Sequence, residues 1–106
     1  MTSIRLYRDK RDLLSGFSVI GHTGFAGAGE DIVCAGVSAL ALTAINALET
    51  VAHIPAHPYI GDGYVSIRLP KSLSRRQRDD AQIILRTAQQ GFTDIAAAYP
   101  RFVRCS

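Results

Sequence analysis

The sequence contains no tryptophan, one methionine and two cysteines. Two cysteines are too few for a disulfide-stapled scaffold, so a hydrophobic core must stabilise the chain. At 106 residues the chain has room for one such core and none for a separate cofactor domain. The length therefore excludes two-domain dehydrogenases, kinases and large hydrolases, and it predicts a single domain over residues 1–106.

The net charge of the chain is also small. Twelve Lys and Arg residues stand against nine Asp and Glu residues, which gives a formal charge of +3. This excess is compatible with an anionic surface but is too weak to identify nucleic acid as a partner. The apolar share of 47% and the charged share of 20% are typical of a globular chain rather than a disordered one.

Long apolar runs are limited to one stretch, Ile32 to Ala47. It lies near the lower length limit for a membrane span, and Asn46 and Glu49 interrupt its end, so we interpret it as a buried helix. Residues 1–14 alternate charged and apolar positions and do not resemble a signal peptide. We therefore expect a cytoplasmic protein without a membrane partner.

Local patterns predict an α+β fold with the order ββαββα. Alternating residues indicate strands, whereas apolar residues at intervals of three and four indicate helices. Hairpins rather than crossovers imply a mostly antiparallel sheet with two helices packed on it. The expected strands are 3–8, 13–21, 57–60 and 64–69; the expected helices are 32–52 and the segment from the capping box at Ser74 to Pro100.

The segment between the second strand and the first helix carries the candidate chemistry. A glycine-rich loop is expected over Thr23–Glu30, with Asp31 as the helix N-cap. Cys34 would then lie in the first helical turn, where free backbone amides and the helix macrodipole favour a negatively charged sulfur. The same free amides could hold an oxyanion. His22 ends the second strand, and an imidazole that reaches the thiol would form an imidazolium–thiolate pair.

Spacing alone leaves other interpretations open, and it favours an inert Cys34 because free cysteine is often buried. His22 could equally be a strand-end residue with a structural partner. Gly24, Gly27 and Gly29 precede a helix but do not match a phosphate-binding loop. Nucleotide binding is therefore not predicted.

The remaining polar clusters predict no cofactor and no metal site. His53 and His57 flank Pro55, which breaks helical geometry, and no ligand spacing joins them to His22 or Cys34. We expect them to be solvated loop residues. Arginines at residues 75, 76 and 78 place positive charge at a helix start, where the helix dipole disfavours it. Such a cluster could bind a ligand, but more often it is a solvated helix face.

The first helix is apolar on nearly all sides, whereas the second has a single apolar stripe. One sheet face covers only one side of a helix, so the other side must meet the second helix or another subunit. We therefore predict a homodimer. The apolar positions are Val33, Val37, Leu40 and Leu48 on one side and Ala41, Leu42 and Ile45 on the other.

The stretch Gly21-His22-Thr23, followed by Gly29-Glu30-Asp31-Ile32-Val33-Cys34-Ala35-Gly36-Val37-Ser38, resembles the ribosomal-processing cysteine protease family, Prp. The resemblance implies a cytoplasmic, homodimeric endopeptidase that needs no cofactor. Its substrate would be the precursor of large-subunit ribosomal protein twenty-seven, whose short N-terminal extension it removes, and no direct contact with nucleic acid would be required.

The same resemblance implies roles for individual residues. Cys34 would be the nucleophile and His22 the general base. Gly21, Gly24, Gly29, Asp31 and Ser38 match motif positions near the site and would support it or bind substrate.

Two other classes compete with a protease. A non-catalytic module bound to the ribosome or to RNA would suit a small basic domain, but we expect no interleaved exposed aromatic residues on the strands. A thiol redox protein is disfavoured because there is no C-x-x-C motif and because Cys105 is expected in a mobile tail.

Overall fold

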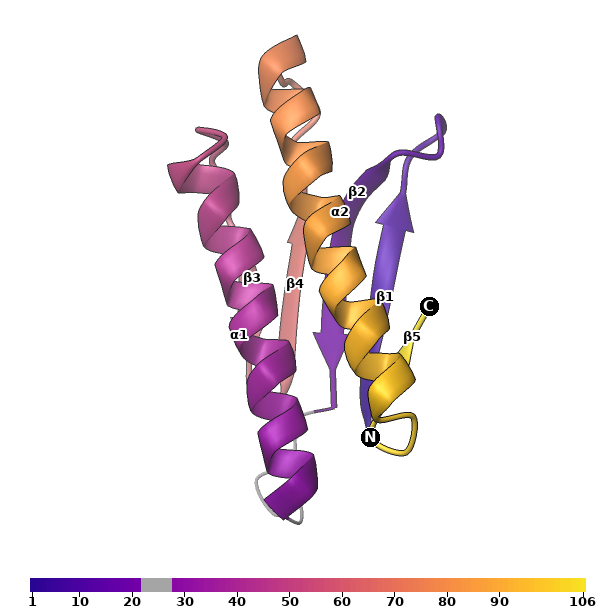
Figure 1. Ribbon diagram of the computed structural model, residues 1–106. Coiled ribbons are helices and arrows are strands. Elements are labelled where there is room, and N and C mark those ends of the chain that lie inside the picture. The colour runs from indigo at the N-terminus through magenta and orange to yellow at the C-terminus, as the bar shows by residue number, and fades with distance from the viewer. Residues whose placement is uncertain (22–27) are drawn as a thin grey trace.

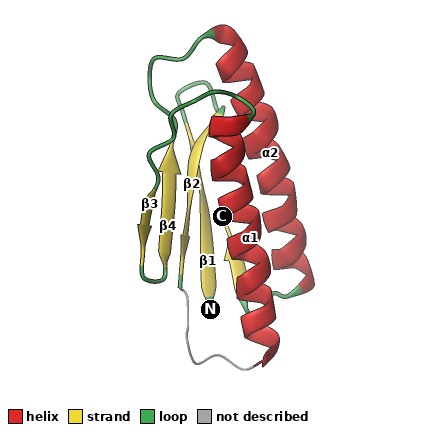
Figure 2. Cartoon of the chain, turned by 90° about the vertical axis from the view of Figure 1, so that its left-hand side faces the viewer, coloured by secondary structure: helices red, strands yellow, loops and turns green. Residues whose placement is uncertain are grey.

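The computed structural model describes residues 1–21 and 28–106, and it describes the first helix's side chains from residue 32 onward. One five-stranded sheet is covered on one face by two long helices (Figures 1 and 2). The α+β fold is thus confirmed. The elements are β1 (Thr2–Arg8), β2 (Leu14–Ile20), α1 (Ala28–Thr50), β3 (Tyr59–Gly61), β4 (Tyr64–Arg68), α2 (Arg75–Ala98) and β5 (Val103–Cys105).

The strand order is β3-β4-β2-β1-β5, and every pairing is antiparallel except that of β1 with β5. Strand β5 was not predicted, and the expectation that Cys105 lies in a mobile tail is wrong, because Cys105 pairs with Ile4. Three residues are too few for an alternating pattern. Backbone hydrogen bonds hold the segment, including Leu6 N–H to the Ser106 carbonyl at 2.8 Å.

The second half of the chain follows the sequence pattern closely. The short edge strand starts just after Pro58, at Tyr59 rather than 57, since proline cannot donate to a ladder. Helix α2 starts with the predicted capping box: the Ser74 hydroxyl accepts from Gln77 N–H at 3.1 Å, and the Gln77 side chain accepts from Ser74 N–H at 2.9 Å. His53 and His57 are exposed loop residues, as expected.

Helix α1 starts earlier than predicted, at Ala28. Asp31 is therefore its fourth residue and not its N-cap, and Gly29 belongs to the helix rather than to a loop. An acidic residue before an apolar run is a frequent cap, but Ala and Glu also favour helix and here extend it towards the N-terminus. The rest of the expected loop, residues 23–27, lies outside the described residues.

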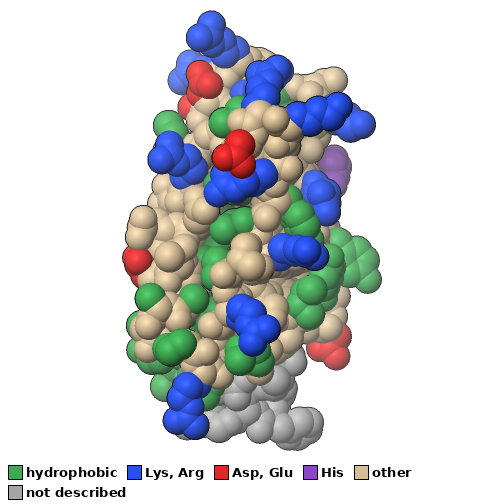
Figure 3. All heavy atoms as spheres, turned by 90° about the vertical axis from the view of Figure 1, so that its right-hand side faces the viewer, with side chains coloured by type: hydrophobic (Ala, Val, Ile, Leu, Met, Phe, Trp, Pro, Cys, Tyr) green, Lys and Arg blue, Asp and Glu red, His purple; other side chains and the backbone are tan. Residues whose placement is uncertain are grey.

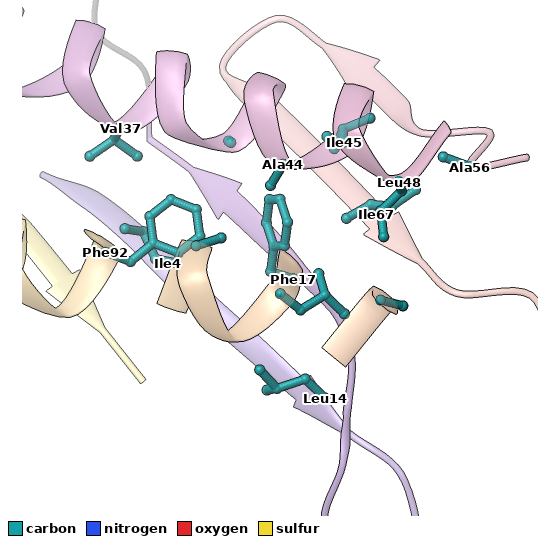
Figure 4. Packing of buried hydrophobic residues seen from close by; sticks show 14 of the residues in the cluster. Ile4, Leu14, Phe17, Val37, Ala44, Ile45, Leu48, Ala56, Ile67 and Phe92 are labelled. Carbon is teal, nitrogen blue, oxygen red and sulfur yellow. The ribbon is translucent and has the colours of Figure 1, made fainter. Parts of the chain in front are cut away.

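The core lies between the helices and the inner face of the sheet. Phe17 of β2 and Phe92 of α2 meet edge to face with ring centroids 5.3 Å apart, and α1 closes the layer from above (Figure 4). Residues Ile32–Thr50 are long and apolar enough to cross a membrane, yet a core helix passes the same test. Six of them are buried in the core: Val33, Val37, Ala41, Ala44, Ile45 and Leu48.

No helix of the described residues covers the outer face of the sheet (Figure 2). Strand register places Tyr7, Tyr59 and Tyr64 on it, since Tyr59 and Tyr64 are diagonal neighbours across the β3–β4 pair. Tyr59 is exposed, and Tyr7 and Tyr64 are half-buried. The expectation that the strands carry no exposed aromatic residue is therefore wrong for Tyr59. Two of these tyrosines sit at strand ends next to proline or glycine turns, where a short strand gives no clear alternation.

Candidate active site

Four segments meet at one end of the molecule: the N-terminus, the end of β2, the β3–β4 turn and the start of α1 (Figures 1 and 2). Gly21 follows β2, and its N–H donates to the Gly63 carbonyl at 3.1 Å. Gly21 has a φ of 110°, and a Cβ there would overlap the Met1 carbonyl oxygen. Only glycine therefore fits the point at which the chain leaves the sheet towards residue 22.

Cys34 faces this end of the sheet from α1. Its side chain is half-buried, and Sγ lies 3.2 Å from Oγ1 of Thr2. Thr2 is 3% exposed and shares the inner face of β1 with Ile4, so the hydroxyl is fixed beneath the sulfur. Either atom of the pair can act as donor. Once Cys34 loses its proton, the hydroxyl is the donor and the sulfur the acceptor.

The longer helix changes the electrostatic argument for Cys34. The cysteine is the seventh residue of α1 rather than the third or fourth. Its amide is therefore used in the regular i to i−4 ladder, and the favourable field of a helix start falls off within the first turn. Among the side chains that the structure describes, the Thr2 hydroxyl is the polar group that contacts the sulfur.

A small pocket of about 150 Å³ opens beside the sulfur. It is much smaller than a pocket for a drug-sized ligand and suits one or two amino-acid side chains. Its walls come from all four segments that meet at this end. The lining residues are Thr2, Val19, Cys34, Val37, Ser38, Gly61, Gly63, Tyr64 and Val65.

The structure brings together part of the predicted site. Ser38 lies one turn after Cys34 and lines the same pocket, while Gly21 lies at the same end of the sheet. Residues 28–31, which include Gly29 and Asp31, form the start of α1. His22 and Gly24 lie outside the described residues.

Thr2 is the one pocket residue in contact with the sulfur that sequence reasoning missed. The signal was present in the alternation of β1, which places Thr2 on the same inward face as Ile4 and Leu6. A polar side chain at an inward position needs a partner. The identity of that partner depends on how α1 packs on β1, which the alternation does not specify.

The second cysteine has a different environment. Burial raises the pKa of the Cys105 thiol, and a hydrogen bond with Thr93 opposes this only in part. A protonated thiol is a poor nucleophile. We therefore expect Cys105 to react more slowly with alkylating reagents than Cys34, so that it can serve as an internal reference in such experiments.

Comparisons with known proteins agree with this picture. The model of the family described as cysteine protease Prp matches residues 1–104. The ribosomal processing cysteine protease Prp of Bacillus subtilis is 39% identical over 85 residues, covering 78% of this chain and 74% of that protein.

Solved structures share the fold over the full chain. A Streptococcus mutans protein has a TM-score of 0.88 at 29% identity and covers 100% of this chain and 96% of its own. The ribosomal processing protease Prp of S. aureus, in complex with a covalently linked product peptide, has a TM-score of 0.82 at 25% identity. The match covers 100% of this chain and 98% of that chain.

Proposed function

The chain belongs to the Prp family of cysteine proteases, and from that premise we propose that it removes the N-terminal extension of large-subunit ribosomal protein twenty-seven with a Cys34–His22 dyad. The observation that carries the proposal is the half-buried Cys34 thiol, which opens on a side-chain-sized pocket at the end where the chain leaves β2 for residue 22. The S. aureus relative with its covalently linked product peptide supports a nucleophile on this fold.

The proposed reaction starts with proton transfer from Cys34 to His22. The thiolate attacks the scissile carbonyl, His22 returns the proton to the leaving amine, and the acyl group remains on sulfur as a thioester. Water, deprotonated by His22, then cleaves the thioester and restores the thiol. During the first step, the Thr2 hydroxyl donates to the thiolate from 3.2 Å and stabilises it.

The oxyanion must lie on the pocket side of the sulfur. The amide of Cys34 is occupied by the helix ladder, so the earlier assignment of oxyanion binding to helix-start amides does not extend to this residue. We assign the substrate backbone to the part of the pocket lined by Gly61 and Gly63. Glycines there let a substrate backbone approach closely.

We further propose that the enzyme acts in the cytoplasm as a homodimer joined through α1. An exposed stripe on that helix consists of Ile32, Ala35, Ala39, Leu42 and Asn46. Ile32 is 72% and Leu42 40% exposed, and no charged residue occurs between Ile32 and Leu48. An uncharged stripe that is apolar except for Asn46 is typical of a subunit interface.

The test is cleavage of a peptide that spans the extension and the first mature residues of the organism's own ribosomal protein. Cys34→Ala and Cys34→Ser are expected to lower kcat/KM at least about a thousandfold, because the nucleophile is lost. Cys105→Ser is the matched control and should cleave normally. Product masses report the cleaved bond, and circular dichroism reports folding. Normal cleavage by folded Cys34→Ala would overturn the proposal.

A further inference from the structure

The uncovered face of the sheet has a composition unlike the rest of the surface. Because partners in a ladder point to the same side, the register defines which residues face outward. These positions hold arginine, tyrosine, small residues and one isoleucine, with no Asp or Glu among them. They are Ser3, Arg5 and Tyr7 of β1; Gly16, Ser18 and Ile20 of β2; Tyr59 and Gly61 of β3; Tyr64, Ser66 and Arg68 of β4; and Arg104 of β5.

Contacts within this face hold the polar and aromatic groups in place. The Arg68 guanidinium lies 3.8 Å from the centroid of the Tyr7 ring, and the Tyr7 hydroxyl donates to Ser18 Oγ at 3.0 Å. Tyr59 and Tyr64 meet edge to face at 5.4 Å, and Tyr59 is 66% exposed. Side chains that are fixed before binding lose less entropy when a ligand arrives.

The charge of the face has one sign. Arg5, Arg68 and Arg104 are exposed. On the neighbouring side of the molecule, Figure 3 shows Lys and Arg side chains from one end to the other, with fewer Asp and Glu side chains between them. The nearest acidic residues in sequence are Asp9 and Asp12 in the turn at one end of the sheet and Asp62 in the turn at the other end. Such a surface complements a polyanion.

We propose that this open sheet face binds single-stranded RNA. The arginines of β1, β4 and β5 contact phosphates, and the exposed Tyr59 ring stacks on a base. The hydroxyls of Ser3 and Ser66 reach 2′-hydroxyls, which both donate and accept, whereas the buried Ser18 only holds Tyr7 in place. An acidic peptide would satisfy the arginines but not the rings.

Cys34 lies on the inner side of the sheet beneath α1, although Gly61 and Tyr64 at the rim of the face also line its pocket. The three arginines and Tyr59 do not line that pocket, so substitutions there separate RNA binding from peptide cleavage.

The experiment measures fluorescence anisotropy of a labelled, unstructured RNA of about 12 nucleotides with the full-length protein, from about 50 to 200 mM salt. We expect a Kd below about 100 µM at the lowest salt. Combined Arg5→Gln, Arg68→Gln and Arg104→Gln should weaken binding at least tenfold. The slope of log K against log salt should fall in magnitude by about two, since each lost phosphate contact contributes about 0.7.

The matched control is combined Arg75→Gln, Arg76→Gln and Arg86→Gln, which removes the same charge from exposed positions of α2. Tyr59→Leu tests stacking and should weaken binding about fivefold or more, whereas Tyr99→Leu, at another exposed tyrosine, should not. All variants should cleave peptide normally.

Three results would overturn the proposal: no RNA binding at low salt, equal loss in the sheet and helix variants, or binding of single-stranded DNA or a poly-glutamate peptide as tight as that of RNA.

Discussion

At the scale of single residues, one hydroxyl–sulfur contact connects the first strand to the first helix. Thr2 is almost fully buried and Cys34 half-buried, so little water competes for their 3.2 Å contact. A hydrogen bond to a charged group contributes about 1.5–3 kcal/mol. Thr2 is therefore a positioning and charge-stabilising residue for the nucleophile in the proposed mechanism.

We predict that Thr2→Val lowers kcat/KM about tenfold or more, because valine keeps the shape of threonine but cannot donate to the thiolate. Thr2→Ser, which retains the hydroxyl, should restore most of the activity. A purely structural role would leave thiol chemistry unchanged. The second readout is therefore the rate of iodoacetamide alkylation of Cys34 at mildly acidic pH, measured in a Cys105→Ser background.

That alkylation rate should fall in Thr2→Val and recover in Thr2→Ser. The Cys105 thiol, whose pKa burial raises, should react more slowly than Cys34 below pH 8 in the unmodified chain. Equal alkylation rates in Thr2→Val and the unmodified protein would show that the hydroxyl does not stabilise the thiolate.

At the scale of elements, the sequence predicts most of the fold because most elements have a strong local signal. The strands β1, β2 and β4 alternate, and α2 has a capping box and a single apolar stripe. The start of α1 and strand β5 have no such signal. Two features depend on the rest of the chain. One is the extension of α1 from Asp31 back to Ala28, and the other is the pairing of Val103–Cys105 with β1.

The site residues likewise divide into those with a local sequence signal and one without it. Cys34 and Ser38 were identified from a contiguous motif and lie on one pocket. Thr2 reaches that pocket from 32 residues away in the sequence. A pairing of this kind follows from helix placement on the sheet, and local patterns do not contain it.

A prediction at this scale concerns the glycine that joins β2 to residue 22. Gly21→Ala should lower the free energy of unfolding by about 1–3 kcal/mol, because the residue has positive φ and its Cβ would overlap the Met1 carbonyl. It should also lower cleavage activity by displacing the neighbouring His22. Chemical denaturation and peptide cleavage measure the two effects.

Gly36→Ala is the matched control. Gly36 lies within α1, and an added Cβ there meets nothing within 4 Å. The substitution should raise the free energy of unfolding by about 0.5–1 kcal/mol, since alanine favours helix over glycine. A Gly21→Ala protein as stable and as active as the unmodified one would contradict the role assigned to this glycine.

At the scale of the whole molecule, the two surfaces that the described residues leave uncovered differ in chemistry. The outer face of the sheet is basic and carries tyrosines, whereas the exposed stripe of α1 is uncharged and mostly apolar. Burial of the stripe against a second copy would keep the sheet face of each protomer open. The dimer and RNA binding are therefore compatible with each other.

The last prediction is that the chain sediments at about twice its mass of 11.5 kDa at micromolar concentration. Leu42→Glu should shift it to monomer, because an isologous interface would bury this carboxylate twice without a partner. Ile83→Glu is the control: Ile83 is 66% exposed on α2, away from the stripe, and the dimer should persist. If the unmodified chain sediments as a monomer, or if both variants behave alike, the interface does not lie on this face of α1.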